Sequence, residues 1–210
     1  MTSDVLTVLS SDDRIRCQFS KAKMLRSIRR LQGKLSSIAG MRYLERHGVI
    51  SDGSVVLSGR WPKVSNEGRM MLGANCELQS FRLRQHFTVR KGAELHIGDQ
   101  AFLNDGVNVC ATRSISIGSH AKIGDMVYIY DTDFHEVAPG MPVRHAPVVI
   151  GDNVWIGANS MVLAGATIGD HSVIAAGSIV TDDIPAMSLA AGIPARVIKS
   201  LEVPDGWVRK

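Results

Sequence analysis

The sequence is poor in aromatic residues and in cysteine. Phe, Trp and Tyr make up only 5% of its 210 residues, and cysteines number 3. Cys17, Cys76 and Cys110 are odd in number and show no C-x-x-C spacing, so neither a disulfide framework nor a zinc site is predicted. We interpret them as reduced thiols of a reducing compartment. Few aromatics, together with 20 glycines, favour a stack of small repeated units.

Long apolar runs are also absent from the sequence. No stretch approaches the roughly 20 apolar residues that a membrane span needs. The N-terminus MTSDVLTVLSSDDR carries acidic residues where a signal peptide would carry positive charge. A cytoplasmic location is therefore expected.

Positive charge is concentrated near the N-terminus. Residues 1–50 hold ten Lys and Arg against four Asp and Glu, although the whole chain has a net charge of +4. Within residues 21–46 the apolar positions recur at helical spacing, which predicts a basic, partly helical N-terminal arm over residues 1–50. Such a helix suits peripheral contact with the inner face of an anionic membrane. It also suits packing on the main domain or on a neighbouring subunit, and we favour this second interpretation.

A period of six residues dominates the C-terminal half. All six positions of one register are aliphatic, namely Ile150, Ile156, Val162, Ile168, Ile174 and Val180. The residue that follows each of them is mostly small, and weaker hexads extend back towards residue 70. One buried aliphatic in every six residues indicates short strands joined by tight turns. Three such strands predict a triangular coil of about 18 residues, stacked on its neighbours at strand spacing.

The regular pattern breaks in VYIYDTDFHEV, residues 127–137, where acidic residues surround His135. Residues 131–149 contain three prolines and read as a loop that leaves the coils and returns. Loops held on a rigid scaffold often carry functional residues, so His135 is the candidate general base. Its tautomer needs a fixed acceptor, which Asp131, Asp133, Glu136 or a backbone carbonyl would each provide.

These motifs resemble a known family. The hexads, and YDTDFH followed by APVVIGDNVWIGANSMVLAGATIG, resemble the hexapeptide-repeat acetyltransferases of maltose, galactosides, nodulation-type sugars and polysaccharide precursors. The resemblance covers about residues 70–199. It implies a mainly β fold, a left-handed parallel β-helix over residues 51–199, and a short tail over residues 200–210. It also implies direct acetyl transfer from acetyl-CoA to a sugar hydroxyl, with His135 as general base and no metal.

The same resemblance implies an acceptor site. Asn104 and Trp155 match positions that contact or border the acceptor in the family. We also assign Asp131 and Asp133, which precede His135, to the acceptor site. The acids around His135 differ from the sugar-acetyltransferase pattern.

A second set of residues is implied for coenzyme A. Small side chains permit backbone contact with pantetheine, a threonine follows in the same groove, and two basic residues suit the nucleotide phosphates. These positions are Ala158, Ala176, Thr181, Arg196 and Lys199. Many relatives have lysine where this chain has Asp182, an acid that disfavours phosphate.

The family assembles as homotrimers with the coenzyme A groove between two subunits, so a homotrimer is implied; no nucleic-acid partner is expected. Alternative acceptors are an amino sugar, an antibiotic or an amino acid such as serine. A zinc enzyme of the β-helical carbonic anhydrase type would need three converging imidazoles, and no H-x-x-x-x-H pair is present. A non-catalytic β-helical scaffold would lack the histidine loop and the IPARVI tail.

Overall fold

The computed structural model describes residues 38–51 and 54–209. Among these residues a helix over 38–46 precedes 20 strands. The predicted arm up to residue 37, its proposed membrane contact and Cys17 lie outside the described residues. Leu44 of the helix is buried in the same apolar core as the strands, and Met41 and Tyr43 pack against that core. The helix therefore covers the first coil.

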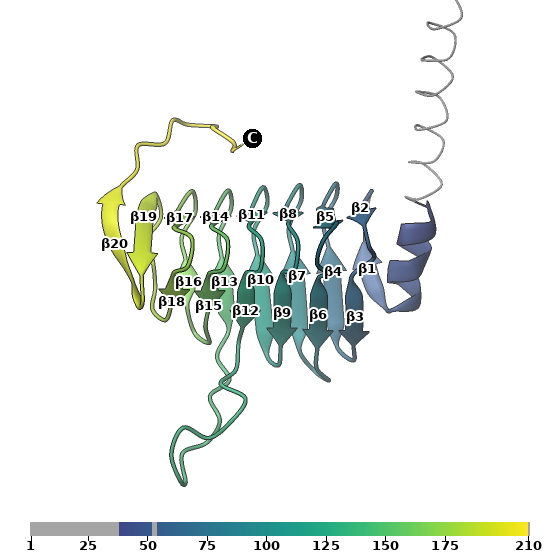
Figure 1. Ribbon diagram of the computed structural model, residues 1–210, viewed down its shortest axis with the longest axis horizontal. Helices are drawn as coiled ribbons and strands as arrows, with labels where there is room; N and C mark the ends of the chain where they lie inside the picture. The colour runs from purple at the N-terminus through teal and green to yellow at the C-terminus, as the bar shows by residue number, and fades with distance from the viewer. Residues whose placement is uncertain (1–37, 52–53, 210) are drawn as a thin grey trace, which may run out of the picture. The chain divides into compact units, whose positions relative to one another are not determined.

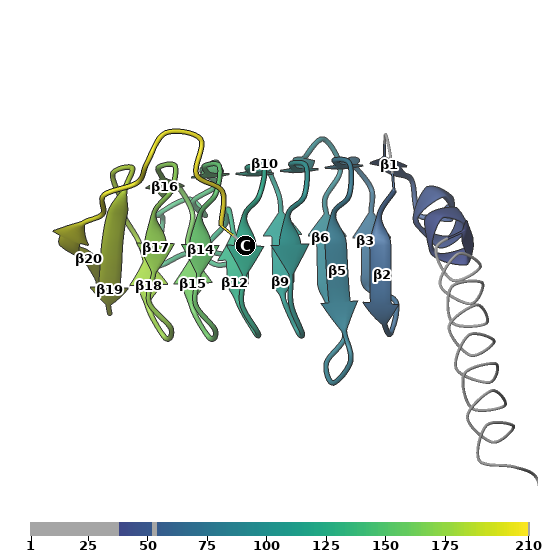
Figure 2. The same ribbon diagram turned by 90° about the horizontal axis from the view of Figure 1, so that it is seen from above.

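The strands form three long parallel sheets that run along a solenoid, as Figures 1 and 2 show. The first sheet contains β1 (Val49–Ser51), β4 (Arg69–Leu72), β7 (Glu94–Ile97), β10 (Ser114–Ile117), β13 (Val148–Ile150) and β16 (Thr167–Ile168). The second contains β2 (Val56–Gly59), β5 (Glu77–Ser80), β8 (Phe102–Leu103), β11 (Lys122–Ile123), β14 (Trp155–Ile156), β17 (Val173–Ile174), β19 (Ser188–Gly192) and β20 (Ala195–Ser200). The third contains β3 (Lys63–Asn66), β6 (His86–Val89), β9 (Asn108–Ala111), β12 (Tyr128–Tyr130), β15 (Met161–Val162) and β18 (Ile179–Val180).

Three consecutive strands make one coil, and each strand from β1 to β15 pairs in parallel with the strand three places later. In the last coil β17 pairs in parallel with β19. Only β20 is antiparallel, because it folds back on β19 after the last coil. The aliphatic residues of the hexads point inward and stack at essentially zero exposure. The structure therefore confirms the predicted parallel β-helix of hexad repeats.

The predicted coil length holds only in the C-terminal coils. Ile150 pairs with Ile168, and Val162 with Val180, each 18 residues later. Leu95 instead pairs with Ile115, 20 residues later. The reason is longer strands: β10 buries both Ile115 and Ile117 on one face, so the hexad register slips there.

Two predicted boundaries differ from the structure. The excursion expected over residues 131–149 ends at residue 147, because Val148 and Val149 pair with Ile115 and Ser116 of the previous coil. The first coil begins at Val49, two residues before the predicted start of the β-helix at residue 51, and residues 51–70 lie in the solenoid although they show no clear hexads. Core residues such as Val55 and Val64 are buried there without the six-residue period.

Among the described residues, no helix is long and apolar enough to cross a membrane. Cys76 and Cys110 are buried thiols, and the Cys76 Sγ donates to the Gly98 carbonyl oxygen at 3.0 Å.

The small residue after each aliphatic has a physical reason that lies in the next coil. A Cβ added at Gly98 would stand 2.6 Å from the Ser119 nitrogen and 2.8 Å from the Gly118 carbonyl carbon, both backbone atoms of the following coil. Successive coils approach so closely at this corner that a side chain does not fit between them.

We expect Gly98→Ala to lower the free energy of unfolding by about 3 kcal/mol, because the coils must separate to admit the methyl group. Gly177→Ala is the matched control: its Cβ would meet nothing within 4 Å, and only its φ of +71° is unfavourable. That control should lose about 1 kcal/mol. Urea unfolding at one fixed protein concentration measures both values. Equal losses would show that crowding between coils does not set the glycine requirement.

Candidate active site

A groove of about 530 Å³ runs along the outer surface of the second sheet. Four of the predicted site residues line it: Asn104, which follows β8, Trp155, which begins β14, and Ala158 and Ala176, which follow β14 and β17. The other lining residues are Gly124, Asp125, Gly157, Val173, Ile174, Ala175 and Leu189. Residues far apart in sequence meet here because the coils stack in register.

Small residues form the floor of the groove. Gly124, Gly157, Ala158, Ala175 and Ala176 keep the backbone accessible to an extended molecule lying along the solenoid. Trp155 is the first residue of its strand and occupies the outward face, where it is 46% exposed.

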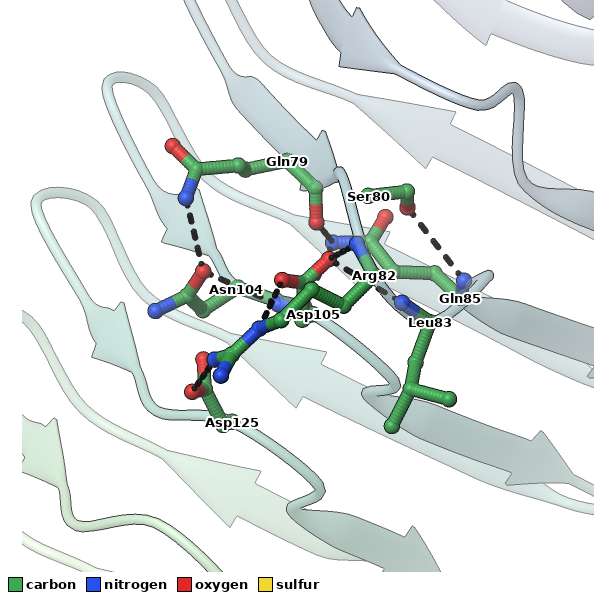
Figure 3. Close-up of polar contacts among 8 residues, drawn as sticks. All are labelled: Gln79, Ser80, Arg82, Leu83, Gln85, Asn104, Asp105 and Asp125. Atoms are coloured by element: carbon green, nitrogen blue, oxygen red, sulfur yellow. Dashed lines mark hydrogen bonds and ion pairs between the residues drawn. The ribbon is translucent and has the colours of Figure 1, made fainter.

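Asn104 is held by a polar cluster that Figure 3 shows. Its Oδ1 accepts hydrogen bonds from Gln79 Nε2 at 3.0 Å and from the Asp105 backbone nitrogen at 2.9 Å. Two donors on the oxygen fix the orientation of the amide, and the Nδ2 group turns away from Gln79. Among the described residues no acceptor contacts Nδ2, so this donor faces whatever occupies the groove.

The same cluster clamps three successive coils. Arg82 donates through Nε to Asp105 Oδ2 at 3.3 Å and through Nη2 to Asp125 Oδ2 at 2.8 Å. Asp105 is 3% exposed. Burial alone would raise the pKa of this carboxyl, but hydrogen bonds from Arg82 and from the Leu83 backbone bring the pKa below its ordinary value. Sequence reasoning missed this clamp, because Arg82 lies in an irregular stretch that carries no motif.

The stem of the histidine loop is ordered by Asp131. Its buried carboxylate accepts hydrogen bonds from Thr112 N at 2.7 Å, Thr112 Oγ1 at 2.8 Å and Arg113 N at 2.7 Å. The stem is closed by antiparallel contacts, including Asp133 N to Arg144 O at 3.1 Å. Asp131 thus fastens the loop to the previous coil, and its assignment to the acceptor stays a prediction.

His135 and Asp133 lie on the exposed part of this loop. The His135 backbone nitrogen donates to the Asp133 carbonyl oxygen at 2.8 Å, but the imidazole has no hydrogen-bond partner among the described residues. Figure 1 shows the loop between β12 and β13 leaving the solenoid on the side opposite the second sheet. Within one chain, His135 and the groove are therefore separate.

The remaining predicted residues lie near the C-terminal end. Thr181 follows β18, and Arg196 and Lys199 are exposed on β20. Asp182 Oδ2 accepts hydrogen bonds from Thr181 Oγ1 and from Arg196 Nη1, both at 3.0 Å. The unusual acid thus engages two of the residues assigned to coenzyme A.

No three His, Cys, Asp or Glu side chains within the described residues gather where they could hold a metal ion. The groove offers a directed amide donor, an exposed indole, a floor of small residues and the carboxylate of Asp125, which is paired with Arg82. No histidine is among its described lining residues.

Comparisons with known proteins point to one family. A family model described as bacterial transferase hexapeptide (six repeats) matches residues 147–182. The chain is 38% identical over 117 residues to the galactoside O-acetyltransferase of Escherichia coli (strain K12), covering 54% of this chain and 58% of that protein. It is 35% identical over 147 residues to a putative acetyltransferase of Saccharomyces cerevisiae, covering 68% of this chain and 74% of that protein.

A solved structure is also similar. The hexapeptide-repeat-containing acetyltransferase of Vibrio cholerae O1 biovar eltor, complexed with acetyl coenzyme A, superposes with a TM-score of 0.56 at 28% identity and covers 79% of each chain. The chain spans between half and two thirds of the length of the Escherichia coli relative.

The different surroundings of the two loop aspartates predict different effects on stability. Asp131→Ala should lower the free energy of unfolding by about 3 kcal/mol, because it leaves buried backbone donors without an acceptor. Asp133→Ala, at an exposed position, is the matched control and should change it by less than about 0.5 kcal/mol. Urea unfolding measures both. Similar small losses for the two variants would contradict the anchoring role of Asp131.

Proposed function

The chain belongs to the hexapeptide-repeat acetyltransferase family, and from this premise we propose that it transfers the acetyl group of acetyl-CoA to a hydroxyl of a sugar or of a polysaccharide precursor. The observation that carries the proposal is the groove in which Asn104, Trp155, Ala158 and Ala176 meet. The proposed location is the cytoplasm, where buried thiols such as Cys110 stay reduced.

The groove fits an extended, flexible chain such as pantetheine. Its small residues leave backbone groups within reach, and exposed Ala176 presents no side chain beyond a methyl group. Arg196 and Lys199 would hold the nucleotide phosphates, because guanidinium and ammonium groups suit phosphate oxygens.

Asp182 modifies this phosphate site. Its ion pair with Arg196 spans 3.0 Å between side chains that are 63% and 65% exposed. An exposed pair of this kind contributes only about 0–1 kcal/mol, so a phosphate would displace Asp182 at little cost. The acid lowers affinity for coenzyme A without preventing binding.

His135 is the proposed general base. Acetyl-CoA would supply the acetyl group as a thioester, which the acceptor hydroxyl oxygen attacks. A ring nitrogen of His135 takes the hydroxyl proton as the new bond forms and later returns it to the departing sulfur. Asn104 Nδ2 is oriented to donate to an oxygen in the groove, and Trp155 borders the acceptor.

A second chain is part of the proposed mechanism. In one chain the loop that bears His135 lies on the side opposite the second sheet, so it cannot serve the groove of the same chain. We place the reaction between subunits of a homotrimer, with His135 of one chain above the groove of its neighbour. Closed cyclic symmetry then gives each subunit one equivalent site.

The test separates binding from chemistry. Calorimetric titration with acetyl-CoA should give similar dissociation constants for wild type and His135→Ala, because His135 is proposed to act on the acceptor hydroxyl and not to hold acetyl-CoA. Acetyl transfer to a panel of galactosides, glucosides and amino sugars should fall by about 10²–10⁴-fold in His135→Ala, the usual contribution of a general base.

His96→Ala is the matched control, since His96 is an exposed histidine on the first sheet, and it should keep full activity. Failure of the wild type to bind acetyl-CoA would end the transferase proposal. Transfer to amino sugars alone would reassign the acceptor to an amine.

A further inference from the structure

A second hollow lies on the same sheet, on the other side of Trp155 from the groove. Its volume is about 450 Å³, within the range of about 300–1,000 Å³ found for small-molecule sites. Its lining residues are Asn75, Glu77, Gln100, Phe102, His120, Lys122, Val208 and Arg209. The proposed acetyl transfer uses none of them.

The C-terminal segment closes one side of this hollow. After β20 the chain turns back along the solenoid past β17 and β14 (Figures 1 and 2). Asn153, only 2% exposed, holds the returning segment: its Nδ2 donates to the Trp207 carbonyl oxygen at 3.2 Å, and its Oδ1 accepts from the Arg209 nitrogen at 2.8 Å. This wall is therefore built into the fold.

The Arg209 guanidinium is fixed between two indoles. It lies 4.8 Å from the ring centroid of Trp207 and 5.8 Å from that of Trp155. Cation–π contacts of this kind restrict the side chain without neutralising it. The Nε atom of Arg209 is buried and has no hydrogen-bond partner in the described chain.

Positive charge in the hollow is in excess of negative charge. Lys122 lies 5.9 Å from the centroid of the Phe102 ring and, like Arg209, forms no ion pair among the described residues. Glu77 is the one carboxylate in the lining. Two unpaired cations facing one carboxylate favour an anionic ligand.

The other lining residues suit a sugar. Phe102 offers an apolar ring, and the Gln100 amide offers a donor and an acceptor to hydroxyl groups. The Asn75 amide adds its Nδ2 donor, while its Oδ1 accepts a hydrogen bond from Ser54 Oγ. A guanidinium matches the planar geometry of a carboxylate and also binds phosphate.

The hollow and the groove are close neighbours. Phe102 lines the hollow and Asn104 lines the groove, two residues apart along one strand and its end. In the next coil, Lys122 lines the hollow and Gly124 lines the groove. At about 3.3 Å per residue the two sites lie roughly 7 Å apart, a distance that one saccharide molecule can bridge.

We propose that this hollow binds a carboxylate or phosphate carried by the saccharide acceptor, while the hydroxyl to be acetylated lies in the groove beyond Trp155. That the ligand is the acceptor rests on the proposed acetyl transfer. Binding at the hollow itself needs no acetyl-CoA.

Galactose, galacturonate and galactose 1-phosphate form a matched set: they share one sugar ring, and they carry no charge, a carboxylate and a phosphate, respectively. Each is titrated into the full-length protein without acetyl-CoA, and binding is followed by the amide NMR shifts of residues that line the hollow. At least one anionic sugar should bind about tenfold or more tightly than galactose, the gain expected from a charge-assisted hydrogen bond. Preference for galacturonate identifies a carboxylate as the natural group, and preference for galactose 1-phosphate identifies a phosphate.

Arg209→Gln and Lys122→Gln should each reduce that preference about tenfold, while the thermal midpoint falls only by the small amount expected from losing the cation–π contacts. Lys63→Gln is the matched control, because Lys63 is an exposed lysine on the third sheet. Binding that is equal for the neutral sugar and both anions, unchanged in both variants, or undetectable at about 50 mM would overturn the inference. Since acetyl-CoA is absent, those results would leave the transferase proposal standing, and its own failure would show in the acetyl-CoA titration.

Discussion

Stacking of each coil on the next, through parallel strand pairing and a column of buried aliphatic residues, is the constraint on which the rest of the molecule depends. Because the pairing is in register, outward-facing residues also fall into columns. Phe102, Lys122 and Trp155 occupy one such column on the second sheet. The groove lies on one side of this column and the positively charged hollow on the other. Both sites are consequences of a regular stack that tolerates few side chains at its corners.

The regular coils provide surfaces but no segment that extends beyond them. The histidine proposed to transfer the proton therefore lies on a loop that interrupts the coils. The loop between β12 and β13 is that interruption, and Asp131 fastens its base to the previous coil. The anchor lets the exposed part of the loop carry His135 away from its own chain. On the proposed mechanism, stability and catalysis are divided between neighbouring residues: a buried aspartate holds the loop, and an exposed histidine four positions later acts on a neighbour.

The features that repeat along the sequence could be predicted from it, and the contacts that do not repeat could not. The hexads from Ile150 to Val180 indicated the solenoid, and the groove residues Trp155, Ala158 and Ala176 stand at hexad positions. Contacts that join distant points leave no period in the sequence. Arg82 reaches Asp125 across 43 residues, and Asn153 holds Arg209 across 56. The orientation of Asn104, the burial of Asp131 and the wall of the hollow all depend on such contacts, which only the folded chain shows.

The central claim is that the groove of one chain works with His135 of another. Two inactive variants test it directly: His135→Ala, which keeps the groove, and Ala176→Trp, which fills the groove and keeps the histidine. After the two are unfolded together, mixed in equal amounts and refolded, about a quarter of the sites should pair an intact groove with an intact histidine. The account predicts that acetyl transfer returns to about a quarter of the wild-type rate. A mixture as inactive as its separate components, with mixed oligomers demonstrated, would contradict a site shared between chains.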